Sequence, residues 1–176
     1  MTPEHLHLAI NHLPVIGMAS AVIPLLVGLL GRSRAALVSG LLLAAVCGWS
    51  LPLVMRSGEE ARARYEQPDR HGIRLDAEVA QALAVHARDA ESRSLVIYMT
   101  AVAATLALLL AVVRMRGVIL LSWMVLLLCL WSVFAGLAIA DSGLKVRRPD
   151  FRAELCPPSL GEDLPQALHR RLDIPA

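Results

Sequence analysis

The stretch that decides the fold is Gly117–Ala140, GVILLSWMVLLLCLWSVFAGLAIA, which contains no acidic, basic or histidine side chain. A helix needs about 20 apolar residues to cross the hydrocarbon core of a bilayer, and a charge at its centre costs roughly 2.5–3.5 kcal/mol on insertion scales. Three more stretches are equally free of charge, at 13–31, 35–55 and 95–113. Because backbone polar groups in lipid must be satisfied internally, the sequence predicts an all-α membrane protein with four transmembrane helices.

Composition agrees with the membrane class and excludes several functions. Apolar residues make up 56% of the chain and charged residues 18%, whereas soluble domains are about a quarter charged. The net charge of +2, without a basic run, argues against nucleic acid as a partner. No phosphate-binding glycine loop, nucleophile elbow or H-E-x-x-H motif occurs. We therefore expect no catalytic residues and favour a protein that is not an enzyme.

The connections between the spans predict the orientation. The longer segments mix both signs, whereas the two short connections are basic without acids and carry the pairs Arg32/Arg34 and Arg114/Arg116. Basic residues favour the cytoplasmic side of a membrane. We therefore expect a multi-pass protein of the bacterial inner membrane with both termini periplasmic. A transmembrane bundle would occupy 1–140, including a periplasmic loop at 56–94, and a periplasmic tail would occupy 141–176.

Two features inside these segments concern packing. Small residues, which let helices approach closely in lipid, recur at four-residue spacing in the ridges Gly17/Ala21, Gly40/Ala44/Gly48, Ala103/Ala107/Ala111 and Ser132/Gly136/Ala140. In the loop, Asp76 is typical of a helix N-cap. The positions Val79, Leu83 and His86 that follow form an apolar stripe at helical spacing. This amphipathic loop helix would present His86 inward or toward the membrane and run into the third span.

The N-terminal segment concentrates histidine. A helix is predicted to begin near Pro3. His5 and His12 would share one face of that helix, and His7 and Asn11 would form an i, i+4 pair. Pro14 restricts the residue before it and is expected to bend the helix where it enters lipid.

The run HLHLAINHLPVIG at 5–17, with its H-x-H-x3-N-H-x-P pattern, resembles a family of uncharacterised bacterial four-helix inner-membrane proteins. SGEEA at 57–61, His86 and Ser142-Gly143 before Arg148-Pro149-Asp150 also fit the family pattern. The resemblance covers roughly residues 4–152 and implies the architecture, with a glycine turn at Gly143 and structural roles for Asn11, Pro14 and Arg148. Relatives tend to carry His-Glu at 86–87 and His-Pro-Glu at 148–150. If those side chains form a metal or haem site in the family, this copy has lost part of it.

The histidines leave several readings open. Imidazoles gathered at the periplasmic edge can ligate b-type haem or a transition metal. For haem the expected axial pair is His12 and His86. For a metal the expected ligands are His5 and His12, completed by His7 or by His86, with Asn11 orienting an imidazole. The alternatives are a polar cluster that fastens the first helix to the loop, or a nearby quinone or lipid site.

The C-terminal tail bears on partners. From Lys145 onward it is polar and contains five prolines, and it is too small to fold alone. Such a tail is typical of a segment that lies across a partner or across the protein's own loop. The leading hypothesis is a non-catalytic membrane subunit that packs into and stabilises a larger inner-membrane complex, electron-transfer or photosynthetic, with lipid and other membrane subunits as partners. The alternative is a redox or metal-binding membrane protein that uses its periplasmic-side histidines.

Overall fold

The computed structural model describes residues 3–65, 77–113 and 117–147, which are helical apart from short turns. The helices are α1 (Pro3–Ile10), α2 (Leu13–Leu30), α3 (Arg34–Trp49), α4 (Leu51–Tyr65), α6 (Ala77–Val112) and α7 (Val118–Arg147). They form four rods, since α1 leads into α2 and α3 into α4, and all four are long and apolar enough to cross a membrane. The prediction of an all-helical chain with four long apolar helices is confirmed.

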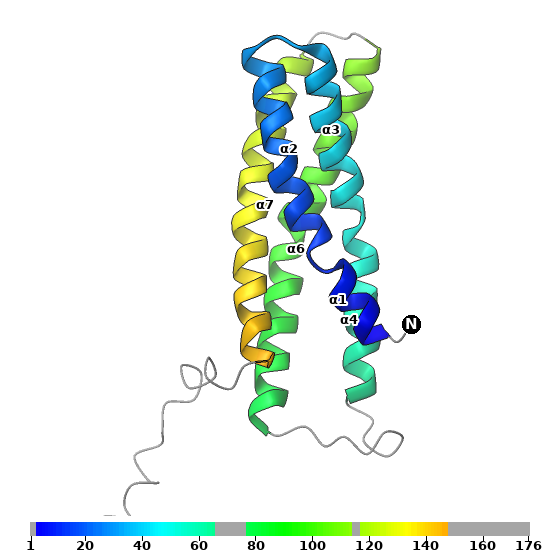
Figure 1. Cartoon of the computed structure of the whole chain (residues 1–176), viewed down its shortest axis with the longest axis vertical. Helices are drawn as coiled ribbons and strands as arrows, with labels where there is room; N and C mark the ends of the chain where they lie inside the picture. The colour runs from blue at the N-terminus through cyan, green and yellow to red at the C-terminus, as the bar shows by residue number, and fades with distance from the viewer. Residues whose placement is uncertain (1–2, 66–76, 114–116, 148–176) are drawn as a thin grey trace, which may run out of the picture.

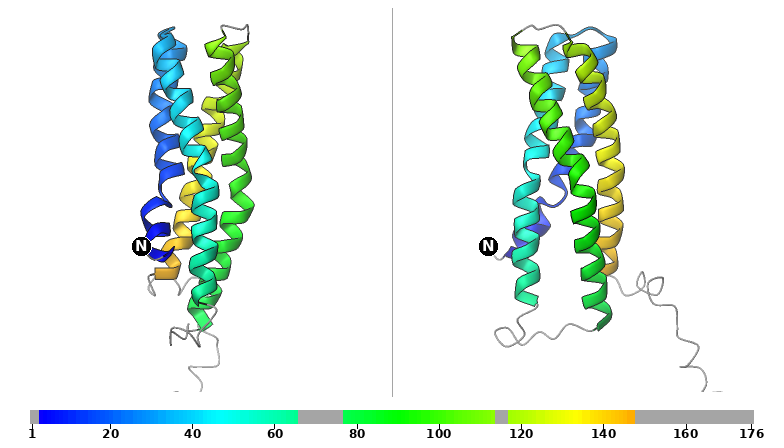
Figure 2. Two further views of the ribbon diagram at one scale, coloured as in Figure 1. Left: turned by 90° about the vertical axis from the view of Figure 1, so that its right-hand side faces the viewer. Right: turned by 180° about the vertical axis from the view of Figure 1, so that it is seen from behind.

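The rods form two antiparallel hairpins side by side (Figures 1 and 2). In the first, α2 packs on α3 and α1 packs on α4; in the second, α6 packs on α7. Contacts of α2 with α7 and of α3 with α6 join the hairpins into one bundle. We call the end with the α2–α3 turn (residues 31–33) the arginine end. The opposite end, where α1 lies against α4, is the histidine end.

Two of the rods are interrupted near the histidine end. Between α1 and α2 the chain turns at Asn11 and His12, and the buried Pro14 lies in the first turn of α2. Proline has no backbone N–H, so it suits a first turn and disfavours a continuous helix through that point. As a result α1 departs from the line of α2 and crosses to α4 (Figure 1).

The second rod and α6 differ in extent from the spans expected at 35–55 and 95–113. Ser50 interrupts the second rod, where its hydroxyl donates to the Cys47 carbonyl at 2.6 Å, and α4 then continues to Tyr65. The loop helix and the third span are one continuous helix, α6, of 36 residues. Polar helix therefore extends beyond the apolar stretches at the histidine end.

Small residues set the spacing of the helices at the core. A side chain at Gly28 would lie 2.5 Å from the Leu37 backbone nitrogen, so α2 and α3 touch backbone to backbone there. Gly17 likewise lies against Cys47. Between α6 and α7 a buried hydroxyl pair, Thr100 and Ser132, is hydrogen-bonded at 2.8 Å. These contacts are those expected of helices that associate in lipid.

The outer surface of the bundle is apolar. Side chains such as Ile23, Leu30 and Phe134 are 69%, 70% and 73% exposed. An apolar surface of this extent would be unfavourable in water and suits contact with lipid. Several predictions fall on residues outside the described ranges, namely those for Asp76, Arg114, Arg116, Arg148 and the tail from 148 to 176.

Candidate functional site

The predicted histidines separate into two groups at the histidine end. His5 and His12 are exposed, and His12 is the N-cap of α2 without a side-chain capping bond. His7 and His86 are half-buried. The break at Asn11 explains the difference: α1 turns His7 toward α4 and leaves His12 outside. The geometry therefore favours His7, rather than the expected His12, as the partner of His86.

His7 is held by the end of the second rod. Its Nδ1 lies 3.1 Å from the Val54 carbonyl oxygen and 3.2 Å from Ser57 Oγ. The Ser57 hydroxyl itself donates to the Val54 carbonyl at 2.8 Å. A carbonyl can only accept, so Nδ1 carries the proton and donates to these oxygens. The ring also packs on Gly58, where an added side-chain carbon would lie 3.0 Å from His7 Cε1.

His86 is held in the same way by α7. Its Nδ1 lies 3.1 Å from Ser142 Oγ, and the Ser142 hydroxyl donates to the Ile139 carbonyl at 2.9 Å. Because that hydroxyl proton is already engaged, Nδ1 is the donor to Ser142 Oγ. The ring packs on Gly143, whose added carbon would lie 3.2 Å from His86 Cε1. Gly143 is helical and accommodates the imidazole, rather than forming the turn expected from the sequence.

The two hairpins therefore repeat one arrangement. In each, a histidine on the first rod donates to the serine of a Ser-Gly pair on the second rod, and the ring packs on the glycine. The histidine and serine are 50 residues apart in the first hairpin and 56 in the second. A Cβ at either glycine would crowd the ring. One imidazole from each hairpin is thus fixed in orientation at the same end of the bundle.

The protonation of these rings suits coordination chemistry. With the proton on Nδ1, the lone pair is on Nε2, the usual arrangement of a metal-bound histidine whose other nitrogen donates to an oxygen. His86 lies nine residues before Leu95, about 13 Å along the helix and outside the apolar stretch of α6. Burial lowers the pKa of His86 from 6.5, and the charge of nearby His7 lowers it further. A lowered pKa keeps His86 neutral, as a ligand must be.

Asn11 adds a polar atom without a partner. Its Oδ1 is fully buried and has no hydrogen-bond partner among the described residues. Asn11 follows His7 by four residues, and its backbone N–H donates to the His7 carbonyl at 2.9 Å. A buried acceptor left unpaired is costly. The expected bond from Asn11 to an imidazole is not formed, so a donor from outside these residues would satisfy it.

The structure does not assemble the expected metal ligands. Within residues 3–65, 77–113 and 117–147 no three histidine, cysteine, aspartate or glutamate side chains are grouped to hold a metal ion. His5, His7 and His12 are therefore not brought together as a set. Histidine is a common ligand of haem iron, so the two anchored imidazoles are the candidate ligands that the structure offers. The buried Asn11 oxygen, which has no partner among the described residues, is compatible with a bound group of this kind.

Sequence reasoning noted Ser57 and Ser142 only as parts of the family pattern and missed that they anchor the rings. A signal was present, since a Ser-Gly pair occurs near the outer end of the second and of the fourth rod. Comparison with protein-family models, curated proteins and solved structures finds no match for this chain. The family resemblance of the N-terminal run thus stays a prediction.

Proposed function

We propose that this chain is a multi-pass membrane protein that binds b-type haem at its histidine end, where His7 and His86 would hold it, and that it takes part in electron transfer. The observation that carries the proposal is the repeated anchoring of one imidazole in each hairpin by a Ser-Gly pair. When bound, haem supplies one-electron redox chemistry.

The roles of the protein groups follow from the contacts. Ser57 and Ser142 fix the tautomer and the direction of each ring, because they accept the Nδ1 proton. Gly58 and Gly143 let the rings lie close to the helix backbones. Hydrogen bonding at Nδ1 also raises the basicity of the ligating nitrogen. Asn11 Oδ1 would accept a hydrogen bond from the bound group or from water beside it.

We also propose that the histidine end is periplasmic and that the protein lies in a bacterial inner membrane. The positive-inside bias supports this orientation, because Arg32 and Arg34 lie together at the opposite end. Protease accessibility of a tag in the α2–α3 turn tests the orientation independently of any cofactor. Cleavage of that tag from the periplasmic side would contradict it.

The test of haem binding is an absorption spectrum of the protein purified in mild detergent, before and after addition of haem. We expect a Soret band with the sharp reduced bands of six-coordinate, bis-histidine iron. His7→Ala or His86→Ala should abolish the six-coordinate spectrum, whereas His5→Ala and His12→Ala, the matched controls, should retain it. Protein that is folded and binds no haem would refute the proposal, and so would a spectrum that depends on His12 and not on His7.

A second function, that of a membrane subunit in a larger assembly, is favoured by one surface feature. A shallow apolar recess of about 400 Å³ lies on α7 between Leu127, Leu130, Trp131 and Phe134. Exposed aromatic side chains of this kind are enriched at protein interfaces. We propose another membrane subunit of an electron-transfer or photosynthetic complex as the partner. Extraction as a larger complex that Trp131→Ala dissociates supports this function; a stable lone monomer contradicts it.

A further inference from the structure

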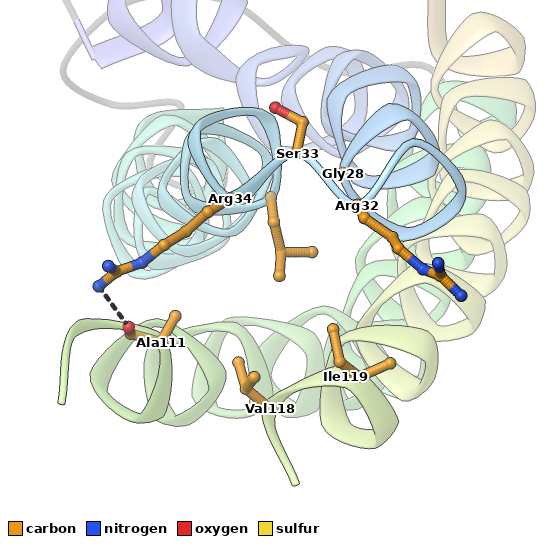
Figure 3. Close-up of a pocket in the computed structure, with 8 residues that line it drawn as sticks. Gly28, Arg32, Ser33, Arg34, Ala111, Val118 and Ile119 are labelled. Carbon is orange, nitrogen blue, oxygen red and sulfur yellow. Dashed lines mark hydrogen bonds between the residues drawn. The ribbon is translucent and has the colours of Figure 1, made fainter. Parts of the chain in front are cut away.

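A second candidate site lies at the arginine end, far from the histidines. A recess of about 320 Å³ opens between the α2–α3 turn and the facing ends of α6 and α7. The side chains of Leu37, Val118 and Ile119 line it, and Arg32 and Arg34 flank it on two sides (Figure 3). The recess thus combines an apolar lining with two cationic side chains at the end of the apolar spans.

The two arginines differ in their contacts. Arg34 donates from Nη2 to the Ala111 carbonyl at 3.0 Å and reaches the Val112 carbonyl at 3.5 Å. These carbonyls belong to the last turn of α6, where a cation also complements the helix dipole. Arg34 is therefore engaged in closing the end of a helix. Its role is accounted for by the bundle itself.

Arg32 differs from Arg34, because the fold explains its backbone but gives its side chain no partner among the described residues. Its backbone has φ +52°, the left-handed conformation that commonly follows a helix C-cap. Gly31, directly before it, has an ordinary φ of −82°. The Arg32 side chain is exposed, and its guanidinium makes no hydrogen bond or ion pair within the described part of the chain. An exposed guanidinium at the edge of an apolar recess, without a partner in the described part of the chain, is available to bind an anion.

The surroundings of Arg32 suit an anion. The first turn of α3 begins two residues later, and the Ser33 hydroxyl accepts the Ala36 amide at 3.4 Å. The amides of Arg34 and Ala35 have no acceptor within the helix, as in any first turn. Helix N-termini of this kind favour anions. Arginine forms paired hydrogen bonds with phosphate, which explains a guanidinium at this position.

We propose that this recess binds an anionic phospholipid, with its phosphate on Arg32 and the first turn of α3 and its first acyl carbons against Val118 and Ile119. The apolar lining and the position at the end of the spans favour a lipid over free phosphate. Basic recesses between membrane helices are suited to anionic headgroups. The site is independent of haem binding at the other end.

The experiment compares lipid binding by native mass spectrometry with thermal unfolding of the full chain. The protein is reconstituted with phosphatidylcholine alone or mixed with phosphatidylglycerol. We expect wild type to retain phosphatidylglycerol and to unfold at a higher temperature with it. Arg32→Gln should weaken retention about tenfold, the scale of one charge-assisted phosphate contact. Arg56→Gln, a matched loss of an exposed arginine at the histidine end, should change nothing.

The Arg32→Gly variant distinguishes a lipid-binding role of the Arg32 side chain from a structural role. Glycine relieves the left-handed backbone, so this variant should be at least as stable as wild type in phosphatidylcholine alone, yet gain nothing from phosphatidylglycerol. If Arg32 had only a structural role, the Arg32→Gly variant would instead be less stable than wild type in both lipid mixtures. Retention of phosphatidylglycerol by the glycine or glutamine variant would overturn the proposal. Stabilisation by inorganic phosphate equal to that by phosphatidylglycerol would overturn the lipid as ligand.

Discussion

The close approach of α2 and α3 at Gly28 gives the sharpest test of the bundle. A Cβ at this position would lie 2.5 Å from the Leu37 nitrogen and 2.6 Å from its Cα. Both atoms are backbone, so no side-chain rotation relieves the overlap. The helices must separate by roughly 1 Å to restore ordinary contact, and overpacking of this kind costs about 1–3 kcal/mol. Gly28→Ala should lower the free energy of unfolding by that amount. The measurement is a titration in which protein folded in a mild detergent is unfolded by increasing amounts of a denaturing detergent.

Gly117→Ala is the control for the glycine-to-alanine change itself. Nothing lies within 4 Å of an added Cβ there, and φ is +93°, so the substitution brings backbone strain of about 1 kcal/mol without an overlap. We expect Gly28→Ala to destabilise more than Gly117→Ala, and to do so with haem absent. A Gly28→Ala protein as stable as wild type would refute the backbone contact between α2 and α3.

Two further predictions concern polar groups. Thr100→Val removes the buried hydrogen bond to Ser132 while conserving the shape of the side chain. Because hydrogen bonds between helices in lipid are worth about 0.6–1.7 kcal/mol, the same titration should show that the free energy of unfolding falls by this amount. Burial and the charge of His7 lower the pKa of His86 below 6.5, so the folded state resists its protonation. Stability should therefore be full above pH 6.5 and fall as the pH drops below it, and His86→Gln should flatten this slope in haem-free protein; an unchanged slope would contradict the burial of the ring.

The number and place of the long helices could be predicted because charge is excluded from lipid, and the stretches such as 117–140 carry none. The full extent of these helices could not be predicted, because the helices continue into polar sequence. Thus α6 begins at Ala77 and α4 ends at Tyr65. Beyond the hydrocarbon, a helix needs only a packed neighbour, and hydropathy gives no information on that. Packing of α1 on α4 supplies that neighbour at the histidine end.

The candidate site was predicted in kind and not in detail. The spans predict histidines at the outer end, but the sequence does not show which of His7 and His12 faces the bundle. The break at Asn11 rotates α1 away from the axis of α2, and a single proline, Pro14, does not specify by how much. The serine anchors depend on contacts between rods about 50 residues apart, which periodicity along one helix cannot reveal.

The contacts of the two histidines support their proposed role as ligands. His7 joins α1 to α4, and a short helix such as α1 would gain from that bond. His86, by contrast, bonds α6 to α7, two helices that pack against each other along the bundle. Neither bond crosses between the hairpins, which are joined by α2 with α7 and α3 with α6. Since α6 and α7 already pack against each other, we infer that the shared effect of both anchors is to fix the ring and its protonated nitrogen. That is the requirement for a pair of ligands.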